Sequence, residues 1–279
     1  MNYKLLMLGC LLCFFKVSAD QASDSLKYKV IYKLSYQPDS TNVASQKSEI
    51  TWLFLGDNSS IFLSKPLAMK DSLPKLSIAD FSSERMKEYK AKTKTHFDFK
   101  VFKSGEEQQL YYTTKILDDK LFYTEPLGTP NWEIHPESKE IFGYQVQKAT
   151  TSFAGRNYVA WFTPEIPIPD GPYKFNGLPG LILSIEDTQQ HYAFSFVGFQ
   201  KLTEPVAFAI TTEDSQKSTK KQLLDLKKRY DKDPISYINN YVGSGGKKVT
   251  VTLTNQDKKD YLKARKAKLA KNNNPIELE

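Results

Sequence analysis

A regular alternation of apolar and polar side chains first appears in residues 26–37. In this run, LKYKVIYKLSYQ, every second side chain is apolar, which predicts a strand with one buried face. Similar alternation, or a short apolar run between turn residues, predicts further strands. They cover residues 50–55, 61–63, 97–103, 110–116, 121–124, 158–162, 181–185, 191–199, 205–211 and 249–253, with a strand pair or one bent strand at 141–153.

Three stretches predict helices, because they lack Pro and Gly and are rich in Lys, Glu, Leu and Ala. They cover residues 81–92, 214–230 and 257–271. The final run, NNNPIELE, is predicted to fray. Strands and helices do not alternate, and no repeat or linker-like composition divides the chain. The pattern therefore predicts a mainly β, β-rich α+β fold: one large curved antiparallel sheet, or an open barrel-like sheet, with two or three helices.

The composition adds two constraints. Aromatic residues make up 13% of the chain, with 16 Tyr and 17 Phe, and such residues suit the half-buried surface of a sheet. The formal net charge is +7, and it falls to +5 without Lys4 and Lys16, which lie in a segment expected to be removed. The lysine-rich run 263–271 is interpreted as a solvated helix face, so we expect no nucleic-acid partner.

The first 19 residues resemble a secretory signal peptide. Lys4 gives a positive start, residues 5–15 form an apolar core, and residues 17–19 (VSA) supply a small-residue cleavage site. The apolar core is too short to cross a bilayer as a helix, and no later segment is long and apolar enough to do so. We expect residues 1–19 to be removed, residues 20–279 to form a single domain, and the protein to be exported to the periplasm or outside the cell.

A lipoprotein signal is the alternative, because a lipid would attach to a cysteine at the cleavage site. Cys10 follows Gly9 but lies inside the apolar core, and Cys13 follows Leu12, which is not small, so cleavage after Ala19 is favoured. The chain contains no other cysteine. Cleavage would leave a protein without disulfides, whose stability must come from its hydrophobic core.

Residues 155–187, GRNYVAWFTPEIPIPDGPYKFNGLPGLILSIED, carry the densest set of prolines and glycines in the chain. Proline fixes φ, and glycine allows positive φ or the close approach of another segment, so we expect a strand, a stiff connector and a second strand. We interpret this central stretch as a rigid corner over the core, and the alternative is the mouth of a ligand groove. The structural motif comprises Gly155, Pro164, Pro167, Gly171, Pro172, Gly177, Gly180, Leu181 and Ile182. The candidate binding residues are Arg156, Trp161, Tyr173, Phe175, Leu178 and Pro179.

The run Gly177-Leu178-Pro179-Gly180-Leu181-Ile182 resembles the name-giving motif of the GLPGLI family, uncharacterised exported proteins of Bacteroidetes-type bacteria. Further resemblance lies at residues 148–149, 153–158, 160–163, 166–167, 171–172 and 175. The resemblance implies a secreted or periplasmic protein of unknown function, more distantly similar to open curved-sheet carriers of lipid or lipoprotein. Val146 stands where many relatives have a cysteine, so any role of a thiol there is absent.

Candidate catalytic chemistry is sparse. His96, His135 and His191 have no compact metal-ligand spacing, and no G-x-S-x-G nucleophile elbow occurs. Residues 243–246, GSGG, resemble half of a phosphate loop but precede a predicted strand rather than a helix, which favours a flexible turn. The acidic residues of the central stretch are interpreted as surface or turn-capping groups: Glu165, Asp170, Glu186 and Asp187. We expect no metal and no cofactor, and the catalytic residues, if any, are unknown.

Arg156 is the polar residue of the central stretch to which the sequence draws most attention. Arginine makes planar, two-pronged contacts that lysine cannot make. A salt bridge or a clamp on backbone carbonyls, which would fix the corner, is favoured over the binding of an anion.

Two functions remain open from the sequence. The leading hypothesis is a non-enzymatic envelope protein that binds an apolar ligand or a partner protein, because the chain combines an aromatic-rich sheet with a rigid motif. The alternative is a secreted or periplasmic hydrolase with an unrecognised site, in which His135 or His191 would lie beside carboxylates.

Overall fold

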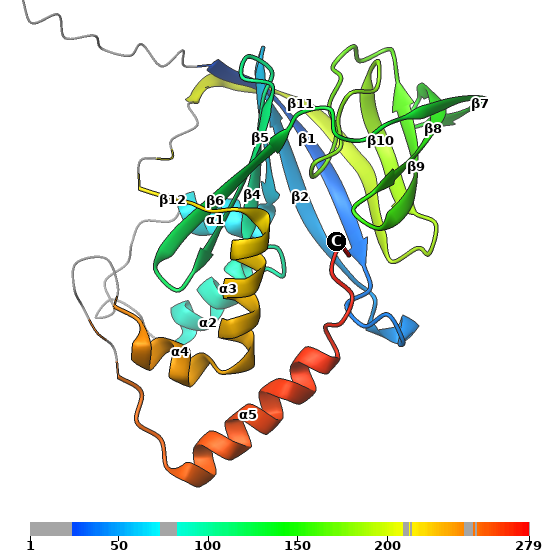
Figure 1. Cartoon of the computed structure of the whole chain (residues 1–279). Coiled ribbons are helices and arrows are strands. Elements are labelled where there is room, and N and C mark those ends of the chain that lie inside the picture. The colour runs from blue at the N-terminus through cyan, green and yellow to red at the C-terminus, as the bar shows by residue number, and fades with distance from the viewer. Residues whose placement is uncertain are drawn as a thin grey trace, which may run out of the picture.

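One twelve-stranded sheet organises the part of the chain that the structure describes (Figure 1). The computed structural model describes residues 24–72, 83–208, 212, 214–242, 248 and 250–278. The strands are β1 (Asp24–Tyr36), β2 (Lys47–Leu55), β3 (Ser59–Ser64), β4 (Phe99–Ser104), β5 (Gln109–Ile116), β6 (Asp119–Pro126), β7 (Glu133–Ile141), β8 (Tyr144–Phe153), β9 (Arg156–Thr163), β10 (Leu181–Asp187), β11 (Tyr192–Phe208) and β12 (Gln216–Lys217). The helices are α1 (Lys65–Ser72), α2 (Ser83–Thr93), α3 (Lys220–Lys232), α4 (Pro234–Asn240) and α5 (Asn255–Ala270), with a 3₁₀ turn η1 (Val43–Ser45).

The sheet joins two meanders through its longest strand pair. β2 to β6 follow β1 in order on one side, and β7 to β11 run back towards β1 on the other. β1 and β11 pair antiparallel along most of their length, and the other neighbours are also antiparallel except at one edge. There β12 adds two residues to β6 in parallel. The sheet is therefore open, and it is antiparallel, as the sequence predicted, except for the two residues of β12 that make it mixed.

Side chains on one face of the sheet form the main core. Val30, Tyr32, Leu34 and Tyr36 of β1 are buried, as the alternation in the sequence predicts. The helix α3 packs at the end of this face, since Leu223 joins buried residues of β5 and β6. This core face is where the central stretch and the C-terminus come together.

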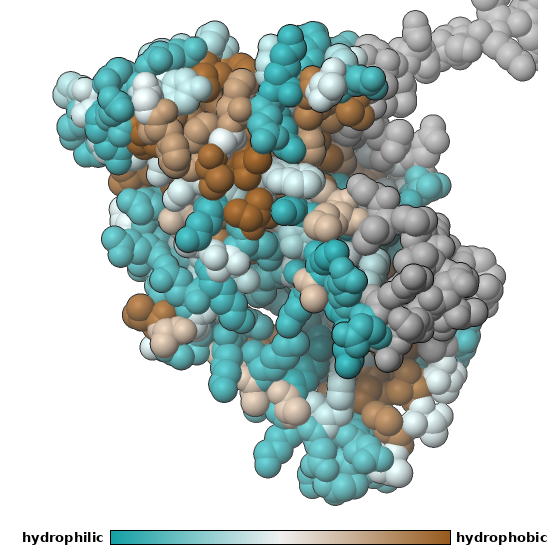
Figure 2. All heavy atoms as spheres, turned by 180° about the vertical axis from the view of Figure 1, so that it is seen from behind, coloured by the Kyte–Doolittle hydropathy of each residue, from teal (hydrophilic) through white to brown (hydrophobic). Residues whose placement is uncertain are grey.

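The opposite face of the sheet is covered only in part. Leu67 of α1 packs against Ile61 and Leu63 of β3, which alternate with the core residue Phe62. Other side chains that alternate with core residues, such as Trp52, stay partly exposed. Figure 2 shows the molecule from behind, where hydrophobic side chains gather in the upper part and hydrophilic ones cover most of the lower part.

The described residues contain five α-helices, so the predicted number of two or three is wrong. The two helices that the sequence pattern does not predict, α1 and α4, are short. Both begin with recognisable caps: the Leu67 N–H donates to Ser64 Oγ, and the Ser236 N–H donates to Asp233 Oδ1 with Pro234 following the cap. No helix among the described residues is long and apolar enough to cross a membrane.

The predicted helix at 214–230 starts later than expected. Thr219 and Gln222 form a capping box, so α3 begins at Lys220, and the residues before it include β12. The predicted helix at 81–92 corresponds to α2, which begins at Ser83, while residues 81–82 lie outside the described residues.

The predicted strand at 249–253 is wrong where it can be checked, at residues 250–253. The side-chain amide of Asn239 takes the place of a partner strand there. Its Nδ2 donates to the Val251 carbonyl at 3.0 Å, and its Oδ1 accepts from the Val251 N–H at 2.7 Å. The predicted strand at 205–211 continues β11 as far as Phe208, and residues 209–211 lie outside the described residues, as do residues 1–19.

Strand β7 was missed apart from its last residue, because its sequence is polar and contains Pro136. It is the edge strand of the sheet, and its register with β8 shifts between Ile134 and Ser138. Proline, charged side chains and such irregularities are typical of edge strands that do not pair further.

The prediction that the C-terminus frays is also wrong. We call residues 272–278 the C-terminal segment; its end lies in front of the sheet beside β1 (Figure 1). Asn274 is buried, its N–H donates to the Pro38 carbonyl, and Ile276 packs against the main core. Polar side chains elsewhere in the chain hold this segment, and the local sequence gives no sign of them.

Candidate functional site

The stretch between β9 and β10 crosses the core face of the sheet instead of making a short turn. We call residues 164–180 the crossing. Its Tyr173 ring contacts Phe62 of β3 and Phe99 of β4, with ring centroids 6.4 and 5.5 Å apart. Phe175 packs against Tyr158 of β9 at 4.8 Å. The crossing therefore fills the space over the sheet with its own side chains.

Two glycines allow the crossing to pack closely. A Cβ atom at Gly180 would lie 2.1 Å from the Thr163 carbonyl oxygen, and φ at Gly180 is +152°. A Cβ at Gly171 would lie 2.7 Å from Ile182 Cδ1. Larger residues at these positions would push β9 and β10 apart or displace the crossing.

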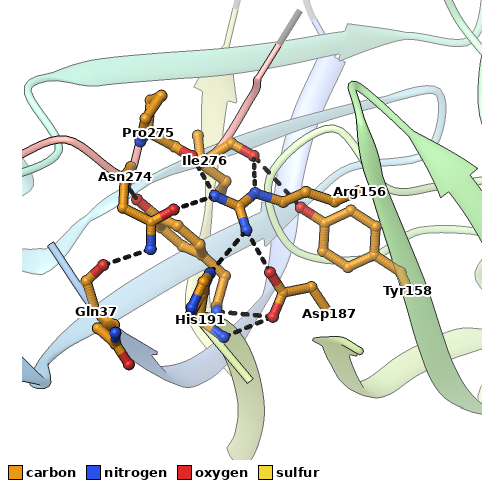
Figure 3. A network of polar contacts seen from close by, with 9 residues as sticks. Gln37, Arg156, Tyr158, Asp187, His191, Asn274, Pro275 and Ile276 are labelled. Carbon is orange, nitrogen blue, oxygen red and sulfur yellow. Dashed lines mark hydrogen bonds and ion pairs between the residues drawn. The ribbon is translucent and has the colours of Figure 1, made fainter. Parts of the chain in front are cut away.

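Arg156, at the start of β9, binds both the sheet and the C-terminal segment (Figure 3). Its Nη1 is 2.6 Å from Asp187 Oδ2, and both side chains are 2% exposed. Its remaining donors reach the C-terminal segment: Nη2 donates to Asn274 Oδ1 and the Pro275 carbonyl, both at 2.6 Å, and Nε donates to the Ile276 carbonyl at 3.1 Å. We call Arg156 with Asp187 and these partners the Arg156 clamp. It is both an ion pair and a clamp on carbonyls.

The second carboxylate oxygen of Asp187 is hydrogen-bonded as well, so the ion pair with Arg156 is fully enclosed. Its Oδ1 accepts from the backbone N–H groups of His191 at 2.6 Å and Tyr192 at 3.2 Å. The interpretation of Asp187 as a surface or turn-capping group is therefore wrong in part: it caps the turn before β11, but it is buried. The cost of burying a charge is offset here by a paired charge and several hydrogen bonds.

Two tyrosines line the Arg156 clamp. Tyr158 OH lies 3.5 Å from the Ile276 carbonyl, and Tyr192 OH donates to the Asn274 carbonyl at 2.6 Å. Burial raises the pKa of both phenols, and the Arg156 charge only partly offsets this rise. Both therefore stay protonated and act as hydrogen-bond donors.

Lys174 of the crossing forms a second buried contact with the C-terminal segment. Its Nζ, 1% exposed as a side chain, lies 2.6 Å from Glu277 Oε1 and 2.5 Å from Glu125 Oε2. Tyr173 OH donates to Glu277 Oε1, and Lys220 lies 2.9 Å from Glu277 Oε2. Burial alone would raise the pKa of Glu277, but the neighbouring Lys174 and the hydrogen bonds lower it below its usual value. We call these residues the Lys174 pocket.

A third buried cation holds the crossing to β4. Lys103 Nζ lies 2.5 Å from Asp170 Oδ1 and donates to the Gly171 carbonyl at 2.7 Å and the Phe175 carbonyl at 3.0 Å. Burial lowers the pKa of Lys103, and the Asp170 carboxylate opposes this effect. Alternation in β4 places Lys103 on the core face with Phe99 and Val101, and the crossing supplies the partners for its charge there.

The sequence-predicted binding residues do not share one surface. Three of them are buried in the core: Tyr173, Phe175 and Leu178. Pro179 is exposed, and Trp161 alternates with buried residues of β9 and lies with its ring centroid 4.0 Å from Lys139 Nζ. Of the predicted structural motif, the exposed residues are Gly155, Pro164, Pro167 and Gly177, and the buried ones are Gly171, Pro172, Gly180, Leu181 and Ile182.

The sequence pointed to Arg156 but not to most of the polar residues that hold the crossing and the C-terminal segment in place. The missed residues are Lys103, Glu125, Lys174, Asn274 and Glu277. Lysine and glutamate are normally exposed, and Asn274 lies in a polar tail, so residue type does not mark any of them as buried. Pairing of residues more than 100 positions apart, such as Arg156 with Asn274, appears only in the folded chain.

The three histidines lie apart in the structure. His96 stacks on Tyr36 with ring centroids 5.0 Å apart, and burial lowers its pKa. His135 Nε2 lies 2.7 Å from Thr150 Oγ1 on the edge strand, and His191 Nδ1 lies 3.4 Å from Arg156 Nη1. No group of three or more potential metal ligands occurs among the described residues, and the GSGG run at 243–246 lies outside them.

A surface hollow of about 360 Å³ lies between α3 and the β6–β12 edge. Its lining is largely polar and includes Gln216, Gln222, Asp225 and Arg229. It contains none of the sequence-predicted site residues. The Arg156 clamp and the Lys174 pocket are the places where the central stretch binds the C-terminal segment.

These features define a class: an open β-sheet protein whose core face is covered by an inserted crossing and by a clamped C-terminal segment. Residues 153–184, from the end of β8 to β10, match the model of a family described as a protein of unknown function (Porph_ging). Membership of the GLPGLI family, which the sequence suggests, stays a prediction. No curated protein matches the chain.

Solved structures similar to this chain include PNGF-II in two space groups, P21 and C2. Each has a TM-score of 0.50 and 11% sequence identity, over 72% of this chain. The chain spans about a third of the PNGF-II chain, of which 32% is covered. At this level of identity the likeness concerns the fold alone.

Proposed function

We propose that this chain is a non-enzymatic binding protein that holds a short polypeptide segment between the Arg156 clamp and the Lys174 pocket. In the present structure the chain's own C-terminal segment occupies this site. A partner protein would present a segment of similar chemistry in its place. This proposal narrows the broader hypothesis of a protein that binds an apolar ligand or a partner protein.

One observation carries the proposal: the C-terminal segment is bound like a ligand. Helix α5, which leads to it, has no buried residue, although it is 16 residues long. The segment itself is held at Asn274, Ile276 and Glu277 by buried polar groups of β9 and the crossing, and by the partly exposed Lys220 of α3. A strand or helix of the core is normally buried along its length. Here the buried contacts are concentrated in a few residues after an exposed helix.

A cut-and-exchange experiment tests this function. A specific protease site is inserted between Lys271 and Asn272, which are exposed, and the full chain is folded before it is cut. A fluorescent synthetic peptide of residues 272–279 is then added in excess, and its uptake is followed by anisotropy and native mass spectrometry, with a scrambled peptide as the control. We expect one-to-one exchange with the sheet intact. Retention of the cut segment until the protein unfolds, or no uptake of the peptide, would contradict the proposal.

We also propose that the protein acts outside the cytoplasm, and residues 1–19 support this. N-terminal sequencing of the protein from cell fractions provides the test. A mature chain that starts at Asp20 in the periplasm or medium is the expected result, and an uncut chain in the cytoplasm would contradict it.

The hydrolase alternative has less support from the geometry. The His135 ring contacts a threonine. The His191 ring contacts Arg156, and the carboxylate beside His191, Asp187, is bound to its backbone N–H and already paired with Arg156, so in the described residues neither ring is hydrogen-bonded to a carboxylate.

A further inference from the structure

The protein recognises Asn274 and Glu277, which lie three residues apart, through contacts with their side chains. Asn274 uses both ends of its amide: Oδ1 accepts from Arg156 at 2.6 Å, and Nδ2 donates to the Gln37 carbonyl at 2.7 Å. An aspartate could not donate to Gln37, and an alanine could make neither bond. The site therefore distinguishes asparagine from its closest relatives.

The residues between these two are held mainly through their backbone. The Pro275 and Ile276 carbonyls accept from Arg156, and the Pro275 ring is exposed. Ile276 adds a partly buried apolar contact with the core. Backbone contacts fix the position of a segment but carry little information about its sequence.

The Lys174 pocket requires a carboxylate. Lys174 and Lys220 bring two positive charges, while Glu125 and Glu277 bring two negative ones. Without Glu277 the pocket would hold two positive charges and one negative charge. The excess positive charge would lie beside the buried Lys174 side chain, where burial makes it costly. A glutamine at this position would leave the two lysines to share a single carboxylate, that of Glu125.

We propose that the site selects segments with the pattern Asn-x-apolar-Glu, in which the Asn side chain binds Arg156 and the Gln37 carbonyl, x is held only through its backbone, and the Glu side chain binds in the Lys174 pocket. This inference rests on the proposed function, because it names the sequence that the site prefers. The residues of the two anchors lie directly after β1 and on β6, β9, the crossing and α3, which pack together, so the spacing of three residues is fixed by the fold.

Peptide variants of residues 272–279 on the cut protein test this specificity. We expect Asn274→Ala and Glu277→Gln peptides to bind roughly tenfold to a hundredfold more weakly than the unchanged peptide, the range for loss of a charged hydrogen bond. The Asn272→Ala peptide is the matched control, because Asn272 is exposed, and its affinity should not change. Equal affinity of the unchanged and Glu277→Gln peptides would overturn the specificity while leaving the binding function intact. Failure of every peptide to bind would instead overturn the binding function itself.

A pair of protein variants locates the effect in the pocket. Lys220 is 31% exposed and contacts Glu277, whereas its neighbour Lys221 is 87% exposed and pairs with Asp225. In Lys220→Met the ratio of affinities for the unchanged and Glu277→Gln peptides should fall at least about threefold, while Lys221→Met should keep the full ratio. If the folded Lys220→Met protein keeps the same ratio of affinities for the two peptides, the Lys174 pocket does not recognise Glu277.

Discussion

At the scale of single residues, the contacts of the Arg156 side chain explain why the clamp needs an arginine. Its planar group reaches a carboxylate, a side-chain amide and two carbonyls at once, each in its own direction. A lysine has one nitrogen and could satisfy only part of this set. The sequence drew attention to Arg156 through its residue type, but its partners were found only in the structure.

Replacement of Arg156 tests this reading. Arg156→Lys should lower the free energy of unfolding by about 3 kcal/mol, because it keeps the charge beside Asp187 but loses most of the bonds to the C-terminal segment. Urea denaturation gives the value. Arg229→Lys on the exposed side of α3 is the control and should change it by less than about 0.5 kcal/mol. An Arg156→Lys protein as stable as the wild type would mean that the clamp contributes little.

A second residue-scale prediction concerns Gly180. Gly180→Ala places a Cβ against the Thr163 carbonyl, and we expect a loss of about 3 kcal/mol or more in the free energy of unfolding. Gly198→Ala in β11 is the comparison, because its Cβ would meet no atom within 4 Å. Similar thermal shifts for the two variants would show that close packing at Gly180 is not what requires glycine.

At the scale of elements, the hairpins β5–β6, β7–β8 and β8–β9 connect their strands through two-residue turns. Between β8 and β9, Ala154 and Gly155 have φ of +47° and +77°, as in a type I′ turn. Asparagine adopts positive φ more easily than alanine. Ala154→Asn should therefore raise the free energy of unfolding by about 0.5–1 kcal/mol, measured by calorimetry, and Gly155→Ala should lower it. A loss of stability in Ala154→Asn would contradict this account of the turn.

Elements with a strong local signal were predictable, and those fixed by distant partners were not. The alternation in residues 26–37 predicted β1 and its buried face, because a strand with one core face has a period of two. The strand predicted at 249–253 failed because one side chain, Asn239, satisfies the backbone. The C-terminal segment was misjudged for the same reason, since Arg156 and Lys174 supply its partners from elsewhere in the fold.

At the scale of the whole molecule, three buried cations join parts of the chain that are distant in sequence. Lys103 ties β4 to the crossing, Arg156 ties β9 to the C-terminal segment, and Lys174 ties the crossing to both β6 and that segment. The sequence located the central stretch and its rigid residues. It could not locate the site, because half of the site is contributed by the C-terminal segment.

Glu277 makes the attachment of the C-terminal segment depend on pH. Its pKa in the folded protein is lowered below the usual 4.5, so its stabilising contribution is complete above about pH 4.5 and is lost as pH falls through the lowered value. The stability difference between wild type and Glu277→Gln should be constant from pH 7 to 5 and shrink at lower pH. Urea titrations of both proteins at several pH values measure it. A difference that grows on acidification would have the wrong sign.

The most direct measurement of the central claim is native-state hydrogen exchange of the uncut protein. The Leu278 N–H donates to the Ala154 carbonyl and reports on the C-terminal segment, while amides of β1 report on the sheet. If the segment is an exchangeable occupant of a binding site, its amide should exchange through local opening, with a free energy several kcal/mol below that of β1 and insensitive to low concentrations of urea. If instead Leu278 and β1 exchange with the same free energy and the same urea dependence, the segment leaves only when the whole protein unfolds, and the site does not bind polypeptides as proposed.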